Sequence, residues 1–201
     1  MAGISYFICD TETTGLKYDF HDLVEISIIR YQDRMQLTEK VKALNPNNAS
    51  FDALQITGKT MQDLYTGMDC IDMVSKVNDF FDTDGLTPAH RCIVAHNAAF
   101  DMKFLHKAWE RYGKQFPAEL WLDTLSMSRK VAKNRGIIKD ASGEKPKFNL
   151  YASCQLFGIK QMGGRHNAKD DTRHTYMLLK HFIDSGVDML EHIKRIPHGD
   201  D

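Results

Sequence analysis

The chain has 201 residues, 42% of them hydrophobic, which is enough for one domain with an ordinary core. Its 26 basic and 27 acidic residues leave a net charge of −1, which excludes a strongly basic protein that coats nucleic acid. A local nucleic-acid site stays compatible with this balance, because bound metal ions add positive charge that the sequence does not count. Without repeats or a linker, the sequence predicts a single domain with a core at about 4–183 and a tail at 184–201.

The cysteines are scattered and form no CxxC pair; they are Cys9, Cys70, Cys92 and Cys154. This usage is typical of thiols in a reducing compartment. The chain shows no signal-peptide pattern and no apolar run of the ~20 residues that cross a bilayer. We therefore expect a soluble, intracellular protein of the cytoplasm that does not contact a membrane.

The first predicted element is a short apolar strand at 4–9 that ends in two carboxylates, Asp10 and Glu12. Residues two apart on a strand project to the same side, and buried like charges repel one another. A hard divalent cation such as Mg²⁺ would compensate them. Taken alone, the motif is better explained as a solvated acidic turn. The following Thr13–Gly15 segment predicts a tight turn that a substrate could approach closely.

The next elements predict an antiparallel hairpin. A second strand is expected at 23–31 and a third at 35–44, the latter with the polar alternation of an edge strand. The connection at 32–34 is short enough for a hairpin turn. These two strands should therefore form one side of a sheet.

The remainder alternates between helices and strands. The pattern predicts short helical pieces at 50–54 and 60–66, helices at 71–81, 98–112, 123–133, 148–157 and 168–183, and strands at 91–95 and 119–122. The segment at 133–147 is typical of a surface loop or small hairpin, and the tail at 188–196 is compatible with a helix. This order implies an α/β fold: a mixed β-sheet of about five strands, one of them antiparallel, flanked by helices.

Two more carboxylates stand at the starts of apolar helices. Asp101 shares a helix face with Leu105, so it either faces a site in the core or is a helix-start residue favoured by the macrodipole. In the last helix Asp171 lies on the face of Phe182, and Asp170 falls less squarely on it. Spacing alone does not decide strongly between the last two acids.

Three motifs together resemble the DEDDh family of 3′–5′ exonucleases, which includes the proofreading exonuclease subunit of bacterial DNA polymerase III and RNase T. The motifs are DTETTG at Asp10–Gly15, HNAAFD at His96–Asp101 and His-x4-Asp at His166–Asp171. A sister group has Tyr four residues before the last Asp, where this chain has Asn167. The resemblance spans nearly the whole chain and favours Asp171 over Asp170 as the ligand.

The resemblance implies a ribonuclease H-like sheet and a two-metal phosphodiesterase site. Two Mg²⁺ or Mn²⁺ ions would be held by Asp10, Glu12, Asp101 and Asp171. His166 would deprotonate the attacking water, and its ordinary pKa of about 6.5 suits a base at neutral pH. Without the other motifs, His166 would be taken for a surface loop histidine.

The resemblance also predicts contacts to the terminal nucleotides. The residues expected there are Thr13, Thr14, Gly15, Leu16, Glu25, His96, Asn97 and Phe100. Leu16 would wedge against bases, Phe100 would stack on a base and Glu25 would position the sugar or a metal-bound water. The alternative explanations are that Leu16 is a partly buried loop residue, that Phe100 belongs to the core and that Glu25 lies on a solvated strand face. The amides of Thr13 and Thr14 would bind the nucleotide, and His96 and Asn97 would order the second motif.

A basic segment precedes the helix expected at 148–157. Its members are Lys130, Lys133, Arg135, Lys139, Lys145 and Lys147. They would either track the phosphates of a single strand or form a solvated loop, and the sequence favours neither explanation. Asp123 and Thr124 are expected to cap a helix.

The sequence favours a metal-dependent 3′–5′ exonuclease that acts on single-stranded DNA or unpaired DNA 3′ ends and releases nucleoside 5′-monophosphates. The enzyme alternative is an exoribonuclease of the RNase T or oligoribonuclease kind. A different class is a non-catalytic subunit that binds nucleic acid or a polymerase. The presence of every carboxylate and of His166 argues against that class. No clamp-binding peptide supports polymerase association, and a homodimer is compatible with the resemblance.

Overall fold

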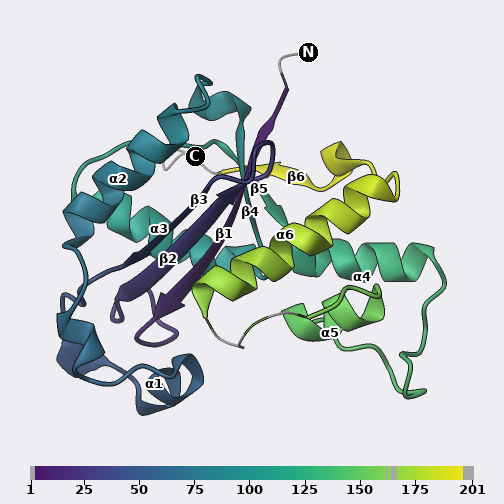
Figure 1. The fold of residues 1–201 in the computed structure, drawn as a ribbon, viewed down its shortest axis with the longest axis horizontal. Helices are drawn as coiled ribbons and strands as arrows, with labels where there is room; N and C mark the ends of the chain where they lie inside the picture. Colours follow the sequence, from purple (N-terminus) through teal and green to yellow (C-terminus); the bar gives the residue numbers. More distant parts are fainter. Residues whose placement is uncertain (1–2, 162, 164–166, 197–201) are drawn as a thin grey trace.

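A mixed sheet of six strands runs through the part of the protein that the structure describes (Figure 1). The computed structural model describes residues 3–161, 163 and 167–196. Within them the strand order is β3-β2-β1-β4-β5-β6. The strands are β1 Ser5–Thr13, β2 Leu23–Arg30, β3 Gln36–Lys40, β4 Arg91–Ala95, β5 Leu120–Asp123 and β6 Ile193–Arg195.

The strand directions confirm the predicted α/β fold with a mixed sheet. β4 pairs parallel with β1, and β5 pairs parallel with β4. β2 pairs antiparallel with both β1 and β3, which is the expected hairpin side of the sheet. The described sheet has six strands rather than about five, and β2 and β6 both run against the others, where one antiparallel strand was expected.

The sixth strand comes from the tail. The segment at 188–196, compatible with a helix by its sequence, forms one 3-10 turn, η4 (Met189–Glu191), and then β6. β6 adds to the edge of β5, with Lys194 opposite Trp121. The edge of β5 has unpaired backbone groups with which a further strand can pair. The hydrogen bonds gained there outweigh the weak helix preference of the three residues in β6.

Two other elements are shorter than expected. β3 ends before the predicted boundary at 44, because the backbone of Val41 forms a parallel bridge with Met68. The helix expected at 60–66 is reduced to the 3-10 turn η2 (Asp63–Tyr65). Gly67 follows with a φ of 104°, a conformation that ends a helix and that glycine adopts without steric cost.

Helices cover both faces of the sheet. They are α1 Phe51–Thr57, α2 Cys70–Asp82, α3 Ala98–Arg111, α4 Thr124–Asn134, α5 Leu150–Leu156 and α6 Ala168–Asp184, with the 3-10 turns η1 Pro46–Asn48 and η3 Pro88–His90. α2 and α3 pack on one face, and α4, α5 and α6 pack on the other (Figure 1). None of the helices in the described part of the chain is long and apolar enough to cross a membrane.

The central strand β1 is buried on both faces, as its apolar sequence predicts. Phe7 and Cys9 point into the core with α2 and α3, where the Phe7 ring stacks on Phe81 with centroids 3.8 Å apart. Ile8 points into the opposite core, which also contains Phe182 of α6. Burying each such side chain contributes about 1.5–3 kcal/mol to the stability of the fold. The position of β1, and of the residues at its C-terminal end, is therefore well fixed.

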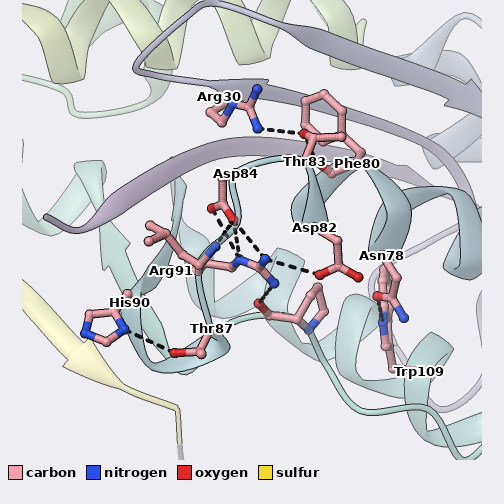
Figure 2. Close-up of polar contacts among 12 residues, drawn as sticks. Arg30, Asn78, Phe80, Asp82, Thr83, Asp84, Thr87, His90, Arg91 and Trp109 are labelled. Atoms are coloured by element: carbon pink, nitrogen blue, oxygen red, sulfur yellow. Dashed lines mark hydrogen bonds and ion pairs between the residues drawn. The ribbon is translucent and has the colours of Figure 1, made fainter. Parts of the chain in front are cut away.

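The opposite end of the sheet is stabilised by a buried arginine at the start of β4 (Figure 2). The Arg91 guanidinium donates to Asp84 at 2.8 Å, to Asp82 at 3.2 Å and to the Pro117 carbonyl at 3.4 Å. Because Ser5 at the start of β1 pairs with Arg91, this network lies away from the carboxylates at the other end of β1. Here a buried charge is compensated by protein groups.

Candidate active site

Three carboxylates converge at the C-terminal end of β1. Asp10 and Glu12 extend from β1, and Asp171 comes from the first turn of α6. One oxygen atom from each of the three lies within 4.8 Å of the others. The alternation of β1 places the first two side by side, and the packing of α6 against β1 and β2 brings in the third.

The ionisation of this carboxylate trio is unfavourable without a cation. Burial, followed by the charges of Asp101 and Glu12, raises the pKa of Asp10 well above its usual value. Burial and the neighbouring Asp171 raise the pKa of Glu12 to about 7. An oxygen-only set of acidic ligands fits hard divalent ions such as Mg²⁺ or Mn²⁺, which would remove this repulsion.

Asp101 borders the trio from the first turn of α3. Its Oδ1 accepts hydrogen bonds from the Thr11 amide at 3.0 Å and the Thr11 hydroxyl at 2.8 Å. Burial raises the pKa of Asp101 to about 7, although the hydrogen bonds from Thr11 act to lower it. The structure therefore brings all four predicted carboxylates close together. One oxygen of Asp101 accepts hydrogen bonds from Thr11 of β1.

The structure separates Asp171 from Asp170. The Asp171 carboxylate belongs to the trio, and its Oδ1 accepts a hydrogen bond from the Tyr151 hydroxyl of α5. Asp170 instead lies near the helix cap, where its amide donates to the Asn167 side chain at 3.3 Å and its carboxylate is 3.5 Å from Arg173. Predicted His166 lies outside the described residues.

Sequence reasoning missed two side chains near the trio, Tyr151 and Lys59. The Lys59 ammonium lies 2.5 Å from the Glu25 carboxylate, and 13% of the Lys59 side chain and 9% of the Glu25 side chain are exposed. Glu25 stands directly opposite Glu12 in the β1–β2 pairing, so the solvated alternative for Glu25 is excluded. A lysine after a Thr-Gly turn looks like a solvated loop residue, and only the tertiary structure shows its partner.

Comparison with known proteins gives the family. An exonuclease family model of the RNase T type matches residues 7–179. The chain belongs to the DEDDh family of 3′–5′ exonucleases.

Relatives with similar sequences are PolC-type DNA polymerase III proteins. The protein of Listeria monocytogenes is 31% identical over 127 residues, 62% of this chain and 8% of the relative. The protein of Bacillus subtilis is 28% identical over 188 residues, 90% of this chain and 12% of the relative. The chain thus spans about a tenth of the length of these relatives.

Solved structures share the fold. Escherichia coli Exonuclease I in complex with a dA16 oligonucleotide aligns with a TM-score of 0.73 and 18% identity, over 90% of this chain and 41% of that one. Exonuclease I from Methylocaldum szegediense gives a TM-score of 0.72 and 20% identity, over 90% and 40%. These similarities confirm the ribonuclease H-like exonuclease architecture.

The second exonuclease motif is ordered by internal hydrogen bonds. The two ring nitrogens of His96 contact the Thr124 hydroxyl at 2.9 Å and the Phe148 carbonyl at 2.8 Å. Asn97 has a left-handed φ of 74°, and its amide donates to Asp123 at 2.9 Å. The predicted ordering of the motif and the capping of α4 by Asp123 are confirmed. A direct contact of His96 or Asn97 with the nucleotide stays a prediction.

The turn after the first exonuclease motif is closed by its own contacts. The Thr14 amide donates to the Asp22 carbonyl at 2.8 Å, so this amide already has an acceptor within the protein, and its expected contact with the nucleotide stays a prediction. The Thr13 hydroxyl donates to the Gly15 carbonyl at 2.8 Å. The space that a Cβ at Gly15 would fill is occupied by the His21 ring, so the protein's own packing requires a glycine here, and contact of Gly15 with a substrate stays a prediction.

The two apolar residues expected at the bases differ in exposure. The Leu16 side chain is 82% exposed, as a residue that wedges against bases would be. Phe100 is partly buried against the core of α2 and α3, and its ring centroid is 5.1 Å from that of Phe104. The core alternative thus explains much of the position of Phe100, and wedging by Leu16 and base stacking by Phe100 stay predictions.

Proposed function

We propose that the chain is a metal-dependent 3′–5′ exonuclease that hydrolyses phosphodiester bonds from the 3′ end and releases nucleoside 5′-monophosphates. The observation that carries this proposal is the trio of Asp10, Glu12 and Asp171 within 4.8 Å, in a member of the exonuclease family. Mutually repelling buried acids are costly unless they bind a cation, so a site kept only for its structure would not be expected to retain them.

The residues of the site have separate roles in the proposed reaction. Asp10, Glu12 and Asp171, with Asp101 beside them, would hold two Mg²⁺ or Mn²⁺ ions. When bound, such ions make water nucleophilic at neutral pH and stabilise the charge on the leaving oxygen. Tyr151 fixes Asp171 through its hydroxyl. We assign His166 as the base that takes the proton of the attacking water.

The preferred substrate is single-stranded DNA or an unpaired DNA 3′ end. The similar PolC-type proteins carry the name of a DNA polymerase, and the similar Exonuclease I structures include complexes with deoxyoligonucleotides. An exposed Leu16 next to the first motif suits a site that receives unpaired bases. RNA is the competing substrate in the experiment below.

The test is digestion of 5′-labelled DNA and RNA oligonucleotides of one sequence with Mg²⁺, Mn²⁺ or EDTA. We expect ladders that shorten from the 3′ end with either metal, more rapidly on DNA. Asp10→Ala should lower the rate by more than about 100-fold, because loss of a ligand should exceed the 10–100-fold cost of losing an outer-shell partner. Asp79→Ala, an exposed aspartate of α2, is the matched control.

Each outcome is informative. Faster digestion of RNA than of DNA would show that the protein is an exoribonuclease rather than a DNA exonuclease. If neither substrate is cut but a labelled strand still binds, the protein is a non-catalytic binding subunit. Equal activity of Asp10→Ala and the unmodified protein would remove the carboxylate trio from the mechanism.

A further inference from the structure

Two clefts lead away from the carboxylates along α5. The first, of about 360 Å³, is lined by Asp171 and Tyr151 and continues over α5. The second, of about 700 Å³, is lined by α5 and by the connection between α4 and α5 at 137–147. Ala152 and Gln155 line both clefts, so the two adjoin along α5, and together they are called the groove, which begins at Asp171.

The far wall of this groove belongs to the basic segment. Residues 130–147 include six basic and two acidic side chains, although the whole chain has a net charge of −1. Lys139 and Lys147 line the groove, and neither forms an ion pair within the described part of the chain. In contrast, Lys130 is paired with Glu191 at 2.8 Å. Figure 1 shows the connection extending beyond α4 and returning to α5.

Two acidic residues of the segment, Asp140 and Glu144, line the same cleft as Lys139 and Lys147, so the lysines act on a strand only as far as the acidic charges are held elsewhere. The Asp140 carboxylate accepts hydrogen bonds from the Ser142 amide at 2.9 Å, the Ser142 hydroxyl at 2.6 Å and the Glu144 amide at 3.2 Å. Its charge is thus directed into its own turn, and the Ser142 hydrogen bond, with Lys147 contributing, lowers the pKa of Asp140. Glu144 is an exposed residue of the cleft lining.

An exposed apolar side chain neighbours Lys139 in the chain, although it is not one of the residues that line the cleft. Ile138, directly before Lys139, is 79% exposed. Exposed apolar groups beside cations suit a single nucleic-acid strand, because its bases offer apolar faces and its phosphates offer negative charge. A folded protein partner would offer no such regular negative charge.

We propose that this groove binds the 5′ portion of the single strand whose 3′ end lies at the carboxylates, with Lys139 and Lys147 contacting its phosphates. This inference rests on the proposed exonuclease function and gives the substrate a direction across α5. It also assigns a role to the basic segment, which the sequence left undecided. Lys139 and Lys147 thereby act as substrate-binding residues remote from the reacting bond.

The test compares Lys139→Gln/Lys147→Gln with a matched control, Lys107→Gln/Lys114→Gln, which changes two exposed or half-exposed lysines of α3 and its following loop. Hydrolysis is measured on 5′-labelled dT12 and dT3. We expect the groove variant to lower the ratio of dT12 to dT3 turnover roughly tenfold, because dT3 is too short to reach the basic wall. The control should leave the ratio unchanged.

Binding without hydrolysis separates this inference from the proposed function. The affinity for labelled dT12 is measured in EDTA over a range of salt concentrations. Loss of two phosphate contacts should reduce the slope of log K against log salt by about 1.4, since each contact to a single strand contributes about 0.7.

The outcomes are distinct. An unchanged salt slope, an equal loss on dT12 and dT3, or the same effect in the control would overturn the groove assignment. If the unmodified protein cuts neither substrate, the exonuclease proposal fails, and the salt slope in EDTA still decides whether the groove binds a strand.

Discussion

At the scale of single residues, Lys59 places a largely covered positive charge beside the carboxylates. Its ammonium lies 2.5 Å from Glu25, and Glu25 faces Glu12 across the β1–β2 pairing. Lys59 acts to lower the pKa of Glu12, against burial and the charge of Asp171, which raise it. Without Lys59, Glu25 would be a buried anion without this partner in an already acidic site.

We therefore predict that Lys59→Met lowers the free energy of unfolding by about 3–5 kcal/mol, the usual cost of removing one partner of a buried ion pair. Lys59→Arg keeps the charge and should lose less. Urea denaturation in EDTA measures both variants. Equal losses for Met and Arg would show that packing of the lysine stem, rather than its charge, stabilises this corner.

Tyr151 is the second residue that the family motifs do not reveal. Its hydroxyl donates to Asp171 Oδ1, so it orients a predicted metal ligand from α5. Tyr151→Phe keeps the ring and removes the hydrogen bond. We expect the affinity for Mn²⁺ to fall about 10–100-fold, as for other outer-shell partners, measured by titration calorimetry. Tyr65→Phe, at an exposed tyrosine, is the control, and an equal change there would contradict the role.

At the scale of elements, Asp123 joins the end of β5 to two helices. Its Oδ1 accepts from the Leu125 amide at 3.0 Å, which caps α4, and from the Asn97 amide at 2.9 Å, before α3. Asp123→Ala should destabilise the protein by about 1–2 kcal/mol through the lost cap. It should also slow catalysis, because α3 carries Asp101.

The matched variant for this prediction is Asp123→Asn, which keeps an oxygen acceptor and a good capping residue. Urea denaturation and the rate on labelled DNA should both be closer to those of the unmodified protein. A rate that is unchanged in Asp123→Ala would mean that the cap stabilises α4 without positioning the second motif.

The elements also show what the sequence could and could not predict. β1 and the capping by Asp123 were predictable because apolar runs and cap residues act locally. β6 was not, because its three residues become a strand only beside the edge of β5. In the same way, motif spacing indicated the four carboxylates, whereas the partners Lys59 and Tyr151 depend on contacts distant in sequence.

At the scale of the whole molecule, the two ends of the sheet differ in how their charges are compensated. At the start of β4, Arg91 is 2% exposed and bonded to two aspartates, so the charges compensate one another (Figure 2). At the end of β1, Asp10, Glu12 and Asp171 crowd together within 4.8 Å. The first arrangement stabilises the fold, and the second reduces its stability until a cation binds.

This contrast sets the pH dependence of the metal-free protein. Burial and neighbouring acids raise the pKa of Glu12 to about 7, and burial raises the pKa of Asp101 to about 7, whereas unfolded carboxyls titrate near pH 4. Between these values the native state binds more protons than the unfolded state, so its stability must fall as pH rises. We predict that the free energy of unfolding in EDTA decreases from about pH 5 to pH 8.

Mg²⁺ should reverse this trend, because it binds the deprotonated carboxylates of the native state. The rise in melting temperature on adding Mg²⁺ should therefore be larger at pH 8 than at pH 5. Glu12→Gln removes one titrating group and should flatten the pH profile in EDTA, whereas Asp79→Asn on the exposed face of α2 should not. Stability in EDTA that rises over this range would show that Glu12 and Asp101 do not titrate with raised pKa values in the native state.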